Sequence, residues 1–202
     1  MATVDFWFEY TSTYSHLAAL RARGAARAAG VALHWRVFLL GPIFGAQGLT
    51  DSPFNLFPAK GANMWRDMER QAAKHGLPSI VRPDPFPQNG LLASRCTTAL
   101  PEAKRPAFAE AVFRAEFAEG RTISDPRVVA ELLAGLGEDA EAVMGAARSA
   151  EVKAALRAET EAAQALGIFG APTFVTEDGE LFWGHDRMED AFAWAAGRAV
   201  RP

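Results

Sequence analysis

Cysteine is almost absent from this chain, and the sequence shows neither a signal-peptide pattern nor a membrane-spanning run. These absences restrict the compartments in which we expect the protein to act. The single cysteine, Cys96, cannot form a disulfide within the chain, and proteins built for an oxidising compartment usually carry an even set. The N-terminal segment lacks a basic start and a small-residue cleavage site, and no uncharged apolar run reaches the length of about 18 residues that spans a membrane. We therefore expect a cytoplasmic protein that contacts no membrane.

The chain also lacks an excess of positive charge. Its 21 basic and 24 acidic residues give a formal net charge of -3, and no basic stripe occurs. Binding of nucleic acid through phosphate neutralisation is therefore not expected. There is no glycine-rich phosphate loop, and His16, His34 and His75 form no metal-ligand pattern with cysteine or carboxylates. We expect neither a nucleotide cofactor nor a metal ion.

What the chain does contain is typical of a globular protein, with 50% hydrophobic and 22% charged residues. Alternating side chains over residues 3–9 predict a strand. Strong helix formers follow over residues 14–29, and Gly30 ends that helix as a C-cap would. Residues 31–40 predict a second strand, which completes a unit long enough for a parallel crossover.

The middle of the chain changes character. Glycine, proline and aromatic residues without periodicity predict a long ordered loop or several short turns over residues 41–57. A helix is predicted over residues 63–75, and prolines make residues 78–87 a rigid connector. Helical spacing over residues 91–166 predicts four or five helices.

After Gly167 the pattern returns to strands. A short apolar strand is predicted over residues 172–175, and the turn signal Asp178-Gly179 joins it to a partner over residues 180–183. A last helix is predicted over residues 186–199.

The resulting element order is that of a thioredoxin-like α/β fold with a large all-helical insertion. The order is strand, helix, strand, helical block, strand, strand, helix. We assign residues 1–90 and 167–202 to a discontinuous thioredoxin-like domain, and residues 91–166 to the helical insertion.

The turn from the first strand into the first helix carries hydroxyl side chains. In thioredoxin folds this turn holds a redox pair of cysteines, but here the two positions are Ser12 and Ser15. Disulfide exchange by the chain's own residues at this turn is therefore excluded. A hydroxyl at a helix N-terminus can donate a hydrogen bond to a thiolate of a ligand, or it can simply cap the helix.

A proline enters the third predicted strand at Ala171-Pro172. Only about 5 to 6% of X-Pro bonds in folded proteins are cis, and these usually mark a special turn. A cis bond here turns the backbone of Ala171 outward, ready to pair with an extended peptide ligand. The alternative is a trans proline at the start of an edge strand.

Four separated stretches together resemble the glutathione-dependent 2-hydroxychromene-2-carboxylate isomerases, relatives of kappa-class glutathione transferases with a DsbA-like thioredoxin fold. The stretches cover residues 8–18, 58–78, 86–95, and 169–173 with 182–187. The resemblance implies a homodimeric cis/trans isomerase. Its substrate is a small aromatic carboxylate, 2-hydroxychromene-2-carboxylate, and its product is trans-o-hydroxybenzylidenepyruvate, a step of naphthalene-type degradation.

The same resemblance implies where glutathione binds. Ser12 matches the residue that hydrogen-bonds the glutathione sulfur, and Ala171, before the presumed cis Pro172, matches the residue whose backbone pairs with the cysteinyl part. Thr13 stands where the family usually has proline, which leaves Thr11 and Thr13 as further candidate hydroxyls.

The turn Gly184-His185-Asp186 resembles the one that holds the γ-glutamyl end of glutathione, although His185 stands where the family usually has an amide. The resemblance implies that Asp186 takes the ammonium group. Asp186 can also cap the following helix together with Glu189, three residues later.

The remaining implied positions surround the two ligands. Lys60 matches a lysine near the glycyl carboxylate of glutathione, and Asn55 lies near an asparagine of the same loop. Asn89 and Arg95 match positions around the aromatic substrate, whose carboxylate suits the planar fork of an arginine, and Tyr14 offers an apolar wall.

Three other functions are alternatives on the same sequence motifs. A kappa-class transferase or peroxidase would use the same sulfur site on another electrophile, and a non-catalytic module would bind glutathione without turnover. A DsbA-like redox protein is disfavoured because positions 12 and 15 hold no cysteine. We expect Cys96, alone in the helical block, to be a buried structural residue.

Overall fold

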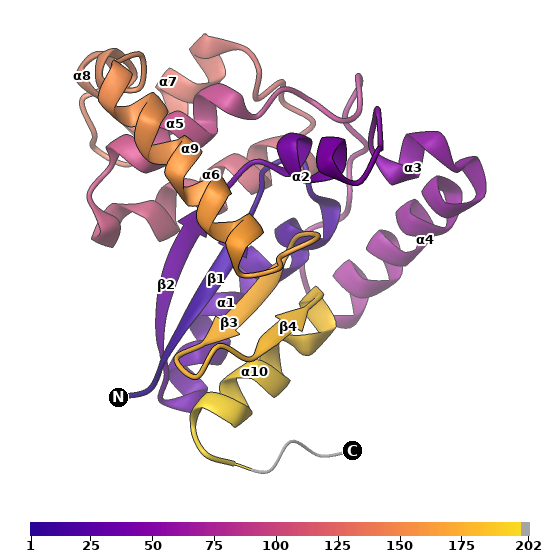
Figure 1. Ribbon diagram of the computed structural model, residues 1–202. Coiled ribbons are helices and arrows are strands. Elements are labelled where there is room, and N and C mark those ends of the chain that lie inside the picture. The colour runs from indigo at the N-terminus through magenta and orange to yellow at the C-terminus, as the bar shows by residue number, and fades with distance from the viewer. Residues whose placement is uncertain (199–202) are drawn as a thin grey trace.

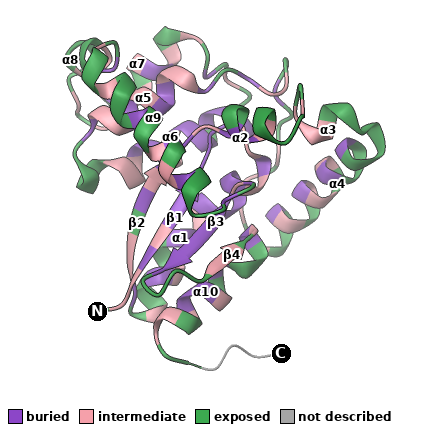
Figure 2. Ribbon diagram, in the orientation of Figure 1, coloured by how far each residue is buried: buried purple, intermediate pink, exposed green. Residues whose placement is uncertain are grey.

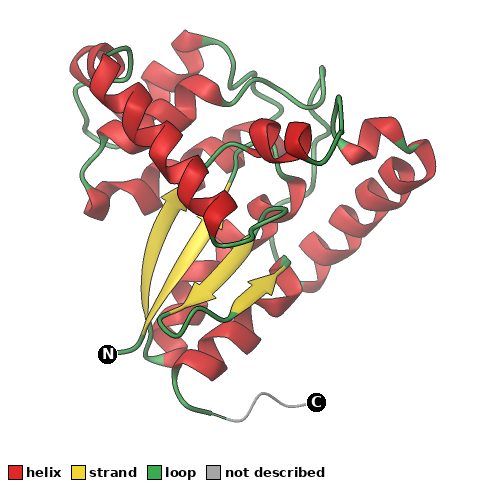
Figure 3. Cartoon of the chain, in the orientation of Figure 1, coloured by secondary structure: helices red, strands yellow, loops and turns green. Residues whose placement is uncertain are grey.

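Four strands form the sheet at the centre of the computed structural model, which describes residues 1–198. They are β1 (Thr3–Phe8), β2 (Ala32–Val37), β3 (Thr173–Thr176) and β4 (Leu181–Trp183), in the order β2-β1-β3-β4. β1 pairs parallel with β2 and antiparallel with β3, and β3 pairs antiparallel with β4. The sheet, yellow in Figure 3, has the arrangement expected of a thioredoxin-like fold.

Helices cover both faces of this sheet. The α-helices are α1 (Thr13–Ala29), α2 (Leu40–Ala46), α3 (Pro53–Leu56), α4 (Pro58–Lys74), α5 (Leu91–Ala99), α6 (Arg105–Phe117), α7 (Pro126–Gly135), α8 (Ala140–Ala146), α9 (Ala150–Ala165) and α10 (Met188–Ala195). Two short 3-10 helices are η1 (Glu102–Lys104) and η2 (His185–Arg187). Helices α1 and α10 lie behind the sheet in Figure 1, α9 crosses in front, and α5 to α8 gather at the upper end. No helix within residues 1–198 combines the length and the apolar character needed to cross a membrane.

Strand β1 divides the core between two layers, as its alternation predicts. Val4, Phe6 and Phe8 pack in the cluster that includes α1, α6 and α10. Trp7 points the other way and packs against Phe38 and the end of α9. Each of these four β1 side chains is almost completely buried, which stabilises the fold by roughly 1.5 to 3 kcal/mol per large apolar side chain. Strands β1 and β3 are accordingly purple along most of their length in Figure 2, whereas β2 and β4, at the edges of the sheet, are largely pink.

Helix α1 forms where the sequence predicts it. Gly30 ends it in the left-handed conformation, with φ of 72°, and donates to the carbonyls of Ala26 and Arg27. The small buried residues Ala18, Ala19 and Ala22 allow the helix backbone to approach the sheet closely. The predicted helix and its glycine cap are both confirmed, and the N-terminus of α1 is thereby fixed at the end of β1.

The structure differs from the predicted elements in four places. The strand predicted over residues 31–40 ends at Val37, and Leu40 already begins α2. The predicted loop over residues 41–57 contains two short helices, α2 and α3, which are too short to show a helical period. Helix α4 begins at Pro58 instead of residue 63, because proline is favoured in the first turn of a helix. The last helix begins as η2 and continues as α10 to Ala195, and its predicted end at Ala199 lies outside the described residues.

Candidate functional site

A cavity of about 790 Å³ lies where β1 ends and α1 begins, within the range of about 300 to 1,000 Å³ that is typical of small-molecule sites. Its wall comes from the turn after β1, from segments 39–54 and 87–91, from the turn before β3, and from Trp183. Much of the wall is apolar. Six of the residues singled out from the sequence line it: Thr11, Ser12, Tyr14, Lys60, Asn89 and Ala171.

Ser12 both caps a helix and faces the cavity. Its Oγ accepts a hydrogen bond from the backbone N–H of Ser15, with an N···O distance of 3.2 Å. The same hydroxyl donates to the backbone carbonyl of Ala171, with an O···O distance of 2.9 Å. The capping interpretation is therefore confirmed. Capping fixes the position of the oxygen, whereas the proton can turn toward another acceptor.

The peptide bond between Ala171 and Pro172 is cis, which excludes the trans alternative. The carbonyl of Pro172 accepts a hydrogen bond from the backbone N–H of Gly184, with an N···O distance of 2.9 Å. Ala171 lies on the cavity wall and meets Ser12, although 159 positions separate the two in the sequence. The fold thus brings a hydroxyl at a helix N-terminus against a peptide backbone segment.

The two neighbouring threonines have other partners. Thr11 lines the cavity, but its hydroxyl donates to the carboxylate of Glu9. Thr13 is buried at the start of α1, where its hydroxyl has no partner among the described residues, and it does not line the cavity. Of the three candidate hydroxyls, Ser12 is the one whose proton points at the peptide segment of Ala171.

Glu9 lines the cavity, although no sequence pattern indicated a role for it. The residue follows β1 directly, is only 5% exposed and accepts a hydrogen bond from the backbone N–H of Thr11, with an N···O distance of 3.0 Å. Burial raises the pKa of the Glu9 carboxyl to about 7, against the opposing effect of the hydrogen bonds from Thr11. A pKa near neutrality in a cavity is common among acid–base groups. Its place directly before the serine turn was the only signal in the sequence.

Tyr14 joins the cavity to the turn after β4. Its ring lies parallel to the ring of His185, with centroids 5.4 Å apart, and its hydroxyl donates to Oδ2 of Asp67 at 3.1 Å. Burial raises the pKa of Tyr14 and lowers that of His185. His185 is buried in this stack and does not line the cavity. It supports the wall through Tyr14.

The turn at Gly184-His185-Asp186 requires its glycine. Gly184 has φ of 115°, and a Cβ added there would lie 2.5 Å from Oδ1 of Asp186. The capping box suggested for Asp186 and Glu189 does not form, because η2 intervenes and neither η2 nor α10 has a side-chain cap. The side chain of Asp186 is 63% exposed, with Arg187 3.8 Å away. Its carboxylate is therefore accessible beside the turn that touches Pro172.

Lys60 and Asn55 have different placements. Lys60 lines the cavity, with its Nζ 4.8 Å from the ring centroid of Phe57. Asn55 does not line the cavity, because its side-chain amide donates to Asp51 and to the carbonyl of Phe86, each at 3.1 Å. Asn55 thus ties two segments of the wall together from outside.

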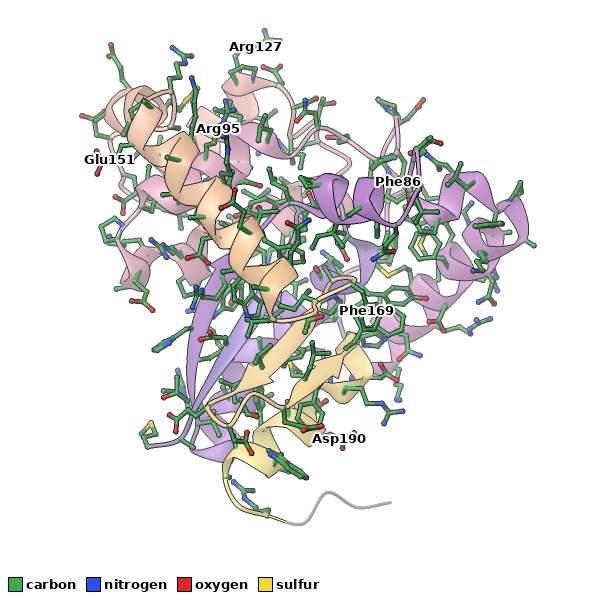
Figure 4. All side chains as sticks on the ribbon, in the orientation of Figure 1. Phe86, Arg95, Arg127, Glu151, Phe169 and Asp190 are labelled. Atoms are coloured by element: carbon green, nitrogen blue, oxygen red, sulfur yellow. The ribbon has the colours of Figure 1, made fainter. Side chains whose placement is uncertain are left out.

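Asn89 lines the cavity, whereas Arg95 lies outside it. Oδ1 of Asn89 accepts from the backbone N–H of Leu91 at 3.0 Å and so helps to start α5. Arg95 lies within the helical block, far from Phe169 on the cavity wall in Figure 4. Leu91 lines the cavity at the start of α5, and Arg95 lies one helical turn further into the helical block. Lys60 is the only lysine or arginine among the residues described as lining the cavity.

The polar groups that line the cavity include hydroxyl, carboxyl, amide and backbone groups and the ammonium group of Lys60. Cys96 is buried in α5, as predicted, and burial raises the pKa of its thiol to about 12. Within residues 1–198, no three histidine, cysteine or carboxylate side chains are grouped so that they could hold a metal ion.

Two sequence relatives match nearly the whole chain. A 2-hydroxychromene-2-carboxylate isomerase from Sphingobium xenophagum is 27% identical over 190 residues, which cover 93% of this chain and 94% of that protein. A protein of the same name from Pseudomonas putida is 27% identical over 193 residues, with 92% and 90% coverage.

Structural similarity agrees with these matches. A solved structure of a 2-hydroxychromene-2-carboxylate isomerase matches with a TM-score of 0.83 at 27% identity, over 92% of this chain and 90% of that one. The family model of the DsbA-like thioredoxin domain matches residues 3–192. The predicted thioredoxin-like fold is thereby confirmed, and the chain belongs to the DsbA-like thioredoxin domain family.

Proposed function

We propose that this protein is a glutathione-dependent isomerase that converts 2-hydroxychromene-2-carboxylate to trans-o-hydroxybenzylidenepyruvate. The names of relatives that match over more than nine-tenths of the chain support this function. The observation that carries it is the contact between the hydroxyl of Ser12 and the carbonyl of Ala171, beside cis Pro172 on the wall of a large cavity. The homodimer and the role in aromatic degradation belong to the same proposal.

Ser12 stabilises a thiolate in this proposal. When bound, glutathione supplies a sulfur nucleophile that adds reversibly to the conjugated substrate, so that a locked double bond becomes free to rotate. The hydroxyl of Ser12 donates to the sulfur, and the N-terminus of α1 adds favourable electrostatics. These two groups favour the charged sulfur over the neutral thiol.

A change of hydrogen-bond partner makes the Ser12 proton available. In the structure this proton is donated to the carbonyl of Ala171. The N–H of an extended peptide ligand can replace it at that carbonyl, as in strand pairing. The oxygen of Ser12 stays fixed by the N–H of Ser15, so only the hydroxyl proton has to rotate.

In this proposal, each charged end of glutathione lies against an accessible side chain of opposite charge. The exposed carboxylate of Asp186 suits the ammonium group, next to the backbone of Gly184. Lys60 suits the glycyl carboxylate. Asn55 and His185 act indirectly, because Asn55 holds the wall and His185 packs against Tyr14.

The second substrate occupies the apolar part of the cavity. Tyr14 and Asn89 line this space and contact the aromatic substrate in the proposal. Arg95 has no part in it, because its side chain lies outside the cavity.

One observation favours a second candidate, a glutathione transferase that acts on a neutral electrophile. Lys60 is the single lysine or arginine among the described lining residues, while Glu9 and Asp51 also line the cavity. A wall of this composition holds a second ligand carboxylate less well than an uncharged ring.

Turnover of 2-hydroxychromene-2-carboxylate, followed by absorbance with and without glutathione, tests the first candidate. We expect glutathione-dependent turnover that falls about 100-fold in Ser12→Ala, in line with the removal of one donor to a developing charge. Ser15→Ala is the matched control. Its buried hydroxyl has no partner among the described residues, so turnover should be unchanged. Glutathione binding without turnover would contradict the isomerase and favour the transferase, which is then assayed on uncharged electrophiles.

A further inference from the structure

Glu9 presents one free carboxylate oxygen at the cavity. Its Oε2 is held by its own turn, because both the N–H and the hydroxyl of Thr11 donate to it. The structure records no hydrogen bond from residues 1–198 to Oε1. Gly90, which also lines the cavity, lies beside that oxygen, since a Cβ added there would be 3.6 Å from Oε1. The carboxylate is thus fixed in position yet able to exchange a proton with a bound molecule.

A second buried carboxyl group, Glu116 of α6, interacts with Glu9. Of the two groups, Glu9 is the one that changes charge. Glu116 is completely buried, and both its oxygens lack a partner among the described residues. Burial, and then the negative charge of Glu9, hold the pKa of Glu116 well above its usual range. Two buried carboxyls that interact do not both ionise. Glu116 therefore keeps its proton, and Glu9 is the one that gains or loses one near neutral pH.

The other ionisable groups around Glu9 do little to neutralise a second negative charge in the cavity. Lys60 and Asp51 line the same cavity with opposite signs. Tyr10, next in sequence, is buried against Thr97, and burial raises its pKa so that it stays neutral. A thiolate formed beside an ionised Glu9 would put two negative charges in a largely apolar cavity, which is costly.

We propose that Glu9 accepts the thiol proton when glutathione binds and returns it when glutathione leaves, an inference that rests on the proposed function. The S–H bond breaks with its electron pair left on sulfur, and the proton forms an O–H bond on the carboxylate of Glu9. One negative charge moves from Glu9 to the sulfur, and none is added to the cavity. The reverse transfer restores the thiol and the carboxylate.

Proton release on glutathione binding tests this transfer without any turnover. Titration calorimetry in two buffers with different ionisation enthalpies counts the protons released. At pH about 8, one unit above the pKa of Glu9, the wild-type protein should release almost none, because the proton stays on Glu9. Glu9→Gln cannot accept it and should release about one proton per glutathione. The glutamine oxygen can still accept the bonds from Thr11, so the turn should keep its shape.

Two controls separate proton transfer from structural effects. Glu116→Gln replaces another buried carboxyl, already neutral, and should release protons as the wild type does. S-methylglutathione has no thiol proton and should give equal counts in wild type and Glu9→Gln. Equal counts with glutathione itself would overturn the role of Glu9 while leaving the proposed function standing. Failure of the wild type to bind glutathione would overturn both.

Discussion

Hydrogen bonds within one turn decide which polar side chains can act in the cavity. Three neighbouring residues carry a hydroxyl group, and the family resemblance indicated Ser12 but left Thr11 and Thr13 as further candidates. The structure separates them, because Thr11 donates to Glu9 and Thr13 is buried away from the cavity. No sequence pattern indicated Glu9, because its surroundings in the cavity, such as Gly90 beside its Oε1, come from segments distant in the chain.

Removal of the Thr11 hydroxyl should raise the pKa of Glu9. The bond from this hydroxyl favours the charged carboxylate and lowers its pKa, and a hydrogen bond to a charged group contributes about 1.5 kcal/mol, or roughly one pH unit. If Glu9 must be ionised to accept a proton, kcat/KM falls below its pKa. In Thr11→Val this fall should move upward by roughly one unit, whereas Thr11→Ser should keep the wild-type profile. An unchanged profile in Thr11→Val would argue against Glu9 as the titrating group.

Glu9 should also reduce stability at neutral pH. Its pKa is raised from 4.5 to about 7, so the folded state binds more protons between these values, and the free energy of unfolding falls as pH rises through them. Glu9→Gln should therefore match the wild type below pH about 4.5 and exceed it by about 3 kcal/mol above pH 7. Urea denaturation at several pH values measures this difference. His16, whose pKa burial lowers to about 4, contributes equally to both proteins. A difference independent of pH would contradict the shift.

At the scale of elements, alternation and helix punctuation predicted most of the fold. β1 and α1 follow the expected boundaries within two residues, because a two-residue period and a glycine cap are local signals. Helices α2 and α3 were not predicted because each is too short to form an amphipathic face. The placement of Arg95 at the cavity was wrong because α5 meets the cavity only at its first residue, Leu91, and the sequence does not show how far the cavity extends along the helix.

The turn after β4 depends on Gly184. Its φ of 115° is strained for any residue with a side chain, and an added Cβ would collide with Asp186. Gly184→Ala should lower the free energy of unfolding by about 1 to 3 kcal/mol and weaken glutathione binding. The matched control is Gly24→Ala in α1, where an added Cβ meets nothing within 4 Å. It should instead raise stability by up to about 1 kcal/mol. Denaturant unfolding compares the two, and equal effects would contradict the role of the turn.

At the scale of the whole molecule, the cavity belongs to both parts of the chain. The thioredoxin-like part supplies Ser12, Ala171 and the N-terminus of α1. The segment that enters the helical block supplies Asn89 and the start of α5, and α6 places Glu116 near Glu9. Motifs predicted the first group because it surrounds one turn and one proline. The resemblance also indicated Asn89, whereas the proximity of Glu116 to Glu9 arises only when α6 packs against α1, so local patterns could not predict it.

The proposed function requires that Ser12 and the N-terminus of α1 stabilise a thiolate in this cavity. The most direct measurement is the ultraviolet absorbance of the thiolate of bound glutathione, followed against pH in wild type and in Ser12→Ala. The wild type should ionise the bound thiol below the ordinary thiol pKa of about 8.5, and Ser12→Ala should move the ionisation back toward that value. A bound thiol that ionises like free glutathione in both proteins would contradict the account.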